Sequence, residues 1–277
     1  MGVWSGITAL VTGASKGIGE AYARELARRG AHLVLVARSG EALERIAEEI
    51  RAEHGVEVDT LALDLSADDG VPRLVAELDR RGHAVDLLIN NAGAGAVGPF
   101  LDSAVERHVA SVELNVVALM RLSHVLGGRM AARGSGGIVN IASTAAFQPM
   151  PYQATYAASK AFVLSFTEAF AAELRGSGVR VMAAHPGATA TGFFDDTTVT
   201  MNPALADPPA RVAARTLDAY AKGAVNAYPG RPLMRVTTWT ARFLPRSAVT
   251  RLAGRLNKAL GHHRARHLDA PSASARA

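Results

Sequence analysis

Short apolar runs alternate with longer amphipathic segments along this chain, and that alternation constrains the fold more than any other feature. Strands are predicted at residues 7–11, 32–37, 56–63, 85–89, 137–141 and 179–184. Helices are predicted after the first strand to about residue 29, and at 41–53, 71–81, 104–130 and 154–174. Strands that alternate with helices of this length form βαβ units, so we expect an α/β protein with a doubly wound parallel sheet.

The charge distribution divides the chain near residue 230. Residues 1–230 contain 20 basic and 24 acidic residues, whereas residues 231–277 contain 10 basic residues and one acid. We therefore expect one main domain over residues 1–230, a basic amphipathic helical extension over 231–265 and a disordered tail over 266–277. Residues 187–209 are irregular and rich in Thr, Pro, Asp and Gly, as is typical of a lid.

The composition excludes several kinds of site. The chain has no cysteine, so it has no disulfide, thiolate metal site or cysteine nucleophile. The N-terminus lacks the basic region of a signal peptide, and no apolar stretch is expected to reach the roughly 20 residues that span a bilayer. We expect a cytoplasmic protein without a bound metal.

A glycine-rich turn follows the first strand, at residues 12–19 (TGASKGIG). Glycines there let backbone N–H groups approach a pyrophosphate at the start of the following helix. A tight turn without a ligand would also account for three glycines, so this motif alone is a moderate signal.

Together with five other motifs, this turn resembles the short-chain dehydrogenase/reductase family over residues 7–195. The other motifs, in order, are Asn90-Asn91-Ala92-Gly93, Asn115, Ser143, Tyr156 with Lys160, and Pro186-Gly187. The resemblance implies an oxidoreductase that acts on a carbonyl/alcohol couple with a nicotinamide cofactor. The residues that it assigns to cofactor binding are Gly13, Ser15, Lys16, Gly17, Ile18, Gly19, Arg38, Asp64, Leu65, Asn91, Ala92, Gly93, Tyr156, Lys160, Pro186, Gly187, Thr189 and Thr191.

The end of the second strand predicts which cofactor is used. An NAD site needs a carboxylate there for the ribose 2′-hydroxyl, whereas an NADP site carries an arginine. Here Ala37 takes the place of the carboxylate and Arg38 follows it, while Lys16 adds a second cation. We expect NADP(H), with NAD(H) as the less favoured cofactor; Arg38 and Lys16 as ordinary solvated charges are the alternative.

The catalytic residues are expected to be Asn115, Ser143, Tyr156 and Lys160. Tyr156 and Lys160 are four residues apart on one helix face, so the lysine ammonium could stabilise a phenolate. The resemblance implies that Tyr156 is the acid in reduction, that Ser143 orients the carbonyl, and that Asn115 holds a water linked to Lys160. Asn115 could instead bond to the backbone.

An apolar, uncharged substrate is expected from the aromatic and apolar residues near these motifs. The predicted pocket consists of Phe100, Phe147, Met150, Tyr152, Phe193 and Phe194. Some of these side chains could be ordinary core.

The basic extension has several interpretations. Apolar residues at helical spacing, among them Trp239 and Phe243, alternate with arginines, as in a helix lying on an anionic membrane. The alternative is that this apolar stripe packs on the protein's own lid or on a second subunit. A metal site formed by His262, His263 and His267 is a weaker interpretation of the same region. No nucleic-acid motif is present. The resemblance implies a homodimer or homotetramer paired through the helices at 104–130 and 154–174.

Two other functions stay open. The first is a non-catalytic NADP(H)-sensing or scaffold protein of the same fold. The second is alcohol oxidation or epimerisation as the physiological reaction.

Overall fold

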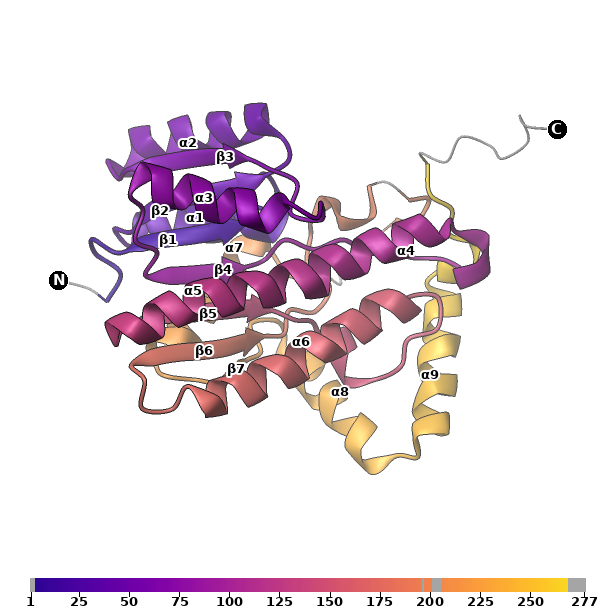
Figure 1. Cartoon of the computed structure of the whole chain (residues 1–277). Helices are drawn as coiled ribbons and strands as arrows, with labels where there is room; N and C mark the ends of the chain where they lie inside the picture. Colours follow the sequence, from indigo (N-terminus) through magenta and orange to yellow (C-terminus); the bar gives the residue numbers. More distant parts are fainter. Residues whose placement is uncertain (1–2, 196, 201–205, 269–277) are drawn as a thin grey trace.

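Seven parallel strands form one sheet in the computed structural model, which describes residues 3–195, 197–200 and 206–268. The spatial order is β3-β2-β1-β4-β5-β6-β7 (Figure 1). The strands are β1 (Thr8–Thr12), β2 (His32–Ala37), β3 (Val58–Ala62), β4 (Leu87–Asn90), β5 (Gly136–Ile141), β6 (Val179–Ala184) and β7 (Asn226–Ala227). The order reverses between β1 and β4, which is where this architecture binds its ligands.

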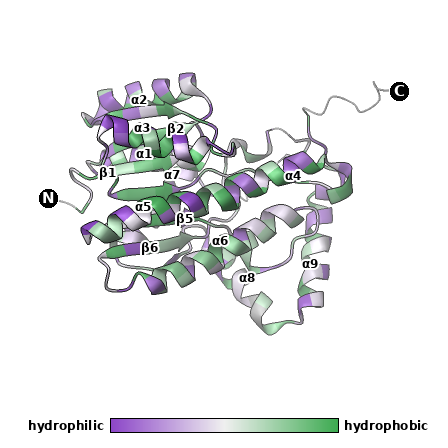
Figure 2. Ribbon diagram, viewed as in Figure 1, coloured by the Kyte–Doolittle hydropathy of each residue, from purple (hydrophilic) through white to green (hydrophobic). Residues whose placement is uncertain are grey.

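Helices cover both faces of the sheet and close two separate hydrophobic cores. One face carries α1 (Gly17–Arg28), α2 (Gly40–His54) and α7 (Pro209–Ala221). The other carries α3 (Gly70–Arg81), α5 (Leu119–Arg133) and α6 (Ala154–Glu173). Figure 2 shows apolar strands lying between the helices, with α2 largely hydrophilic and α6 largely apolar. Apolar strands between two layers of helices form a buried parallel sheet.

Most of the predicted elements are confirmed, with bounds that shift by a residue or two. The predicted bounds of β2 and β6 are those of the structure. The helix predicted at 104–130 is divided into α4 (Val105–Val112), a π-helical turn η2 (Glu113–Ala118) and α5. No prediction covered α7 or β7.

The helical run Val105–Arg133 also corrects one expectation. By length and composition, this one helix of the described residues could cross a membrane. Its α5 half packs Leu119, Leu122, Leu126 and Met130 into the interior, so the sheet occupies much of its apolar side.

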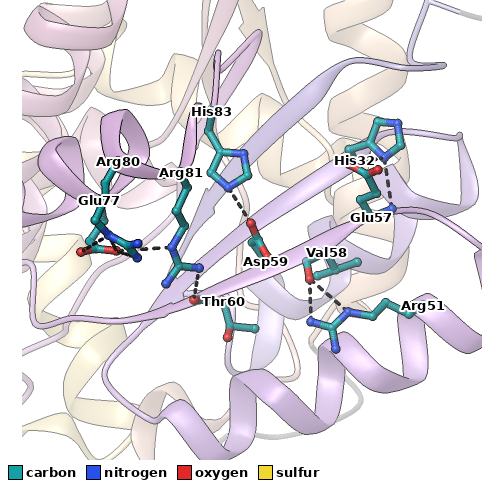
Figure 3. A network of polar contacts seen from close by, with 10 residues as sticks. All are labelled: His32, Arg51, Glu57, Val58, Asp59, Thr60, Glu77, Arg80, Arg81 and His83. Atoms are coloured by element: carbon teal, nitrogen blue, oxygen red, sulfur yellow. Dashed lines mark hydrogen bonds and ion pairs between the residues drawn. The ribbon is translucent and has the colours of Figure 1, made fainter.

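Arginine side chains cover the exposed edge of the sheet at β3 (Figure 3). Arg51 donates to the Val58 carbonyl at 3.0 and 2.6 Å, and Arg81 donates to the Thr60 carbonyl at 3.3 Å. His83 lies 2.6 Å from the Asp59 carboxylate. Because these edge-strand carbonyls already accept hydrogen bonds, fewer backbone groups are free to pair with a strand of a second chain.

The C-terminal extension forms two helices, α8 (Pro232–Phe243) and α9 (Arg246–Ala259), followed by a 3₁₀ turn η6 (His262–Arg264). The turn that joins α8 to α9 projects away from the sheet in Figure 1. Beyond η6, Thr197 and His267 form an antiparallel bridge. Part of the segment predicted to be disordered is therefore paired with the 187–209 segment, and residues 269–277 lie outside the described residues.

Candidate functional site

Two residues join the ends of β1 and β4 at the switch point of the sheet. The Thr12 hydroxyl donates to the Ile89 carbonyl at 3.2 Å and accepts the N–H groups of Asn91 and Ala92, both at 3.0 Å. The Asn91 amide donates to the Thr12 carbonyl at 2.9 Å and to the Gly13 carbonyl at 3.3 Å. The predicted glycine turn and the predicted Asn-Asn-Ala-Gly segment are thus held side by side.

The glycine turn needs glycine for both conformation and space. Gly13 and Gly17 have φ angles of +66° and +64°, in the left-handed region. A Cβ at Gly19 would lie 2.1 Å from the Gly13 carbonyl oxygen, and one at Gly17 would lie 3.1 Å from the Thr191 methyl carbon. Helix α1 begins at Gly17 without a side-chain cap. The turn, with Ser15 half-buried and Ile18 packed on the core, therefore presents backbone at a helix N-terminus, where anions bind.

Asn115 lies in the π-helical turn, is fully buried and is bonded on all sides to the protein. Its Oδ1 accepts the Ala94 N–H at 2.9 Å, and its Nδ2 donates to the Ala94 carbonyl at 2.8 Å. Nδ2 also reaches the hydroxyls of Ser111 at 3.2 Å and Ser159 at 3.1 Å. The amide therefore fixes the loop after Gly93, as the backbone-bonding alternative predicted; the water relay stays a prediction.

Ser143, Tyr156 and Lys160 converge beside this loop. Ser143 lies beside Tyr156, close enough to lower the pKa of its phenol. The Lys160 Nζ donates to the Ile141 carbonyl at 2.7 Å and lies 5.9 Å from the centroid of the Tyr156 ring. A Cβ at Gly93 would lie 2.9 Å from the Asn115 Oδ1 and 3.5 Å from the Lys160 Nζ, so the four predicted catalytic side chains and the loop form one cluster.

Burial dominates the acid–base properties of this cluster. It raises the pKa of Tyr156 above its usual value of 10.0, and the hydrogen bond with Ser143 offsets part of that rise. It lowers the pKa of Lys160 from 10.5 to about 8. The expected lowering of the Tyr156 pKa by Lys160 is thus not seen: desolvation favours the protonated phenol.

The two cations predicted to select the cofactor lie at the rim of the same edge. Arg38 and Lys16 are exposed, and the Lys16 Nζ donates to the Gly192 carbonyl at 3.4 Å. Burial is the largest single influence on the Asp64 carboxyl and raises its pKa. Two hydrogen bonds from Ser66 and the charge of Arg38 together lower the pKa by more, so the pKa of Asp64 is below its usual value. Asp64 also closes a turn through Ser66, and Leu65 beside it is buried.

The segment after β6 closes over the glycine turn. Thr189 is buried and forms a parallel bridge with Asp207, while the Thr191 hydroxyl donates to the Thr189 carbonyl at 3.4 Å. The Pro186 carbonyl accepts from the Ser143 hydroxyl at 3.5 Å. A Cβ at Gly187 would lie 3.3 Å from the Met234 side chain, which brings α8 over this loop.

The predicted pocket residues occupy different surroundings. The Phe193 ring meets the Tyr156 ring edge-on at 5.2 Å. Phe147 packs on His185 at 5.1 Å, and the half-exposed Phe100 packs on His108 at 4.5 Å. Met150 and Tyr152 are half-buried in the segment that precedes α6, and the Phe194 side chain lies outside the described residues. Among the rings that the structure describes, Phe193 is the one in contact with Tyr156.

Sequence reasoning missed the residues that hold the site together. Thr12, Ser111 and Ser159 supply its buried hydroxyl contacts. Thr12 and Ser159 stand inside motifs already recognised, which is the signal that could have identified them. Ser111, which donates to the Ala94 carbonyl at 2.9 Å, precedes Asn115 by four residues, so one helical turn separates them.

A parallel sheet of this order, with a glycine turn at its switch point and polar residues converging at the carboxyl ends of β4 and β5, defines a Rossmann-type protein. A family model described as short chain dehydrogenase matches residues 7–202. The chain belongs to the short-chain dehydrogenase family.

Particular relatives extend this result. A short chain dehydrogenase of Pseudocercospora fijiensis is 37% identical over 188 residues, which are 67% of this chain and 60% of that protein. The very-long-chain 3-oxoacyl-CoA reductase of Anas platyrhynchos is 31% identical over 269 residues, covering 93% of this chain and 81% of the relative. A short-chain dehydrogenase of Sphingobium yanoikuyae, solved with NADPH, is 34% identical with a TM-score of 0.78, covering 86% and 92%. A similar structure from Burkholderia phymatum holds NAD. The chain thus spans only about 60% of the length of the Pseudocercospora relative.

Proposed function

We propose that this protein is an NADPH-dependent oxidoreductase that reduces a ketone or aldehyde to an alcohol. The observation that carries the proposal is the convergence of Ser143, Tyr156 and Lys160 at the carboxyl edge of the sheet, beside the glycine turn. The similarity to a 3-oxoacyl-CoA reductase supports an apolar carbonyl substrate.

The glycine turn and its surroundings fit a dinucleotide. Gly13, Gly17 and Gly19 leave backbone accessible where any Cβ would clash or be strained, and α1 directs its N-terminus at the same place. In this proposal Lys160 would hold the nicotinamide ribose, and Thr189 and Thr191 would hold the nicotinamide carboxamide and a phosphate. When bound, NADPH supplies the hydride that forms the new C–H bond.

The chain's own residues supply the proton and orient the substrate. Because burial raises its pKa, Tyr156 keeps its proton at neutral pH and donates it from Oη to the carbonyl oxygen as charge develops there. The Ser143 hydroxyl, which lies beside Tyr156, positions the same oxygen. Lys160, with a pKa of about 8, can return a proton to the phenolate at neutral pH.

The preference for NADPH rests on Arg38 and Lys16. Both cations are exposed at the rim, where a 2′-phosphate would gain charge-assisted hydrogen bonds, and Ala37 offers no carboxylate to a free 2′-hydroxyl. The Sphingobium structure with NADPH supports this preference, although the Burkholderia structure holds NAD.

The test is cofactor consumption with a panel of ketones, aldehydes and ketoacyl thioesters, measured with NADPH and with NADH. We expect reduction of at least one apolar carbonyl and a kcat/KM at least tenfold higher with NADPH. Oxidation of alcohols alone, or binding of NADPH without turnover of any substrate, would contradict the proposal.

A second property, attachment to an anionic membrane, is proposed from the outer face of α8 and α9. Large apolar side chains are exposed there, including Phe243 at 78% and Trp239 at 50%. Residues 219–268 contain no acidic residue, so a second copy placed symmetrically on this face would bring cations together. A surface that is both anionic and apolar, such as a lipid bilayer, matches the face better.

Co-sedimentation with phosphatidylserine-containing vesicles tests this attachment. We expect binding that weakens with salt, is lost on pure phosphatidylcholine, and falls severalfold in Trp239→Ser. The control Leu101→Ser removes an exposed apolar side chain outside the extension, which is 91% exposed against 50% for Trp239. Absence of binding, or equal binding by both variants, would refute the attachment; tighter binding to a DNA duplex would favour nucleic acid instead.

We also propose self-association through α4, α5 and α6. Val105, Val109 and Val112 form an exposed stripe on α4, and Met120 and Phe162 extend it. Unpartnered apolar faces of this kind mark interfaces. Light scattering should give a mass at least twice that of one chain, and a monomer at micromolar concentration would contradict the proposal.

A further inference from the structure

The last helix of the extension reaches back to the segment that precedes Tyr156. The Asn257 side chain in α9 is buried, and its Nδ2 donates to the Pro151 carbonyl at 2.7 Å. One turn earlier, Gly254 leaves room for the Pro151 ring: a Cβ there would lie 3.2 Å from it. More than 100 residues separate the partners, so the contact belongs to the tertiary structure.

A second contact lies two residues further along the same segment. The Gln153 Nε2 is 3.1 Å from the Nδ1 of His262, and both side chains are buried. Because an amide nitrogen only donates, His262 accepts through Nδ1 and is neutral here. The backbone carbonyl of Gln153 accepts the Ala157 N–H at 2.9 Å, at the start of the helix that carries Tyr156.

Between these two contacts the backbone is held in a strained conformation. Tyr152 has a φ of +69°, the one positive value among the non-glycine residues that the structure describes. Its carbonyl accepts the Gly98 N–H at 2.9 Å, and its ring lies 6.2 Å from that of His263. Such conformations persist only where the surroundings fix them, and they cluster at ligand-binding sites.

We propose that Asn257 and His262 are positioning residues that hold residues 150–153 in this conformation and thereby set the affinity for the carbonyl substrate. This inference rests on the proposed function. Lys160 is held by the Ile141 carbonyl and Tyr156 lies beside Ser143, so these neighbours of the proton-transfer groups come from outside the extension. Loosening the segment therefore widens the substrate side of the site and leaves the chemical step in place.

The test uses full-length Asn257→Ala and His262→Ala, each with NADPH bound. The matched control is Leu256→Ala, which changes an exposed neighbour on α9. We expect the KM for the carbonyl substrate to rise at least fivefold in both variants, with kcat and the Kd for NADPH within twofold of wild type. Leu256→Ala should leave all three constants unchanged.

Hydrogen exchange of residues 148–155 gives a readout that needs no turnover. Exchange there should accelerate in both variants but not in the control; if Asn257→Ala does not fold, His262→Ala supplies the same readouts. Unchanged exchange and KM would overturn the proposal, and so would a loss of kcat with KM unchanged, which indicates a merely structural role. If the wild type reduces no carbonyl, the proposed function fails while exchange still decides whether the extension holds this segment.

Discussion

Buried Lys160 makes a specific prediction about how stability depends on pH. Its folded pKa of about 8 lies below the ordinary lysine value of 10.5. Between these two values the unfolded chain binds more protons than the folded one, so the free energy of unfolding rises with pH. Burying the ammonium costs about 3 kcal/mol at pH 7, of which about 2 kcal/mol is recovered by pH 9.5.

The assay is chemical denaturation of the cofactor-free protein between pH 7 and 9.5, for wild type and Lys160→Met. Other groups titrate in the same range, so the informative quantity is the difference in the free energy of unfolding between the two proteins. We expect wild type to gain about 2 kcal/mol on the variant as pH rises. The same comparison with Lys222→Met, an exposed lysine, should stay flat. A difference for Lys160→Met that does not change with pH would refute the reasoning.

Three further predictions follow from the site. Gly17→Ala forces a side chain into a left-handed position 3.1 Å from Thr191, so NADPH affinity measured by fluorescence should fall at least tenfold; unchanged affinity would contradict the turn's role. Arg38→Ala should lower the NADPH-to-NADH ratio of kcat/KM by about 10- to 100-fold, as expected for a charged hydrogen bond; the exposed Arg45→Ala should not, and an equal effect of both would exclude 2′-phosphate recognition. Asn115→Ala leaves the Ala94 amide and carbonyl without their partner, so denaturant unfolding should show a loss of about 2–4 kcal/mol; a loss below 1 kcal/mol would argue against its anchoring role.

Local pattern was sufficient for the sheet and for the residues that follow its strands. The runs at 32–37 and 179–184 have the bounds of β2 and β6, because a strand covered on both faces is apolar over most of its length; His32 and the exposed Arg180 are the polar residues of these strands. The same strand pattern predicted that the candidate site residues lie close together. Residues after β1, β4 and β5 must meet at one edge of a parallel sheet.

Features that depend on distant partners could not be predicted. The π-helical turn at Asn115 leaves no trace in the hydrophobic period of residues 104–130. The strained Tyr152 carries an ordinary side chain, and its conformation depends on contacts with Gly98 and with the extension. β7 has only two residues and is too short to show a pattern. The Lys160 pKa required knowledge of burial, which sequence spacing does not supply.

The most direct test of the account compares turnover and cofactor binding in Tyr156→Phe. Removing the phenolic hydroxyl eliminates the proton donor and leaves the ring that packs on Phe193. With any carbonyl that the wild type reduces, we predict a loss in kcat of at least about 100-fold, in the range of general acid catalysis. The Kd for NADPH should stay within about threefold, because the glycine turn is untouched. Turnover within tenfold of wild type would show that another group supplies the proton and would contradict the assignment of this site.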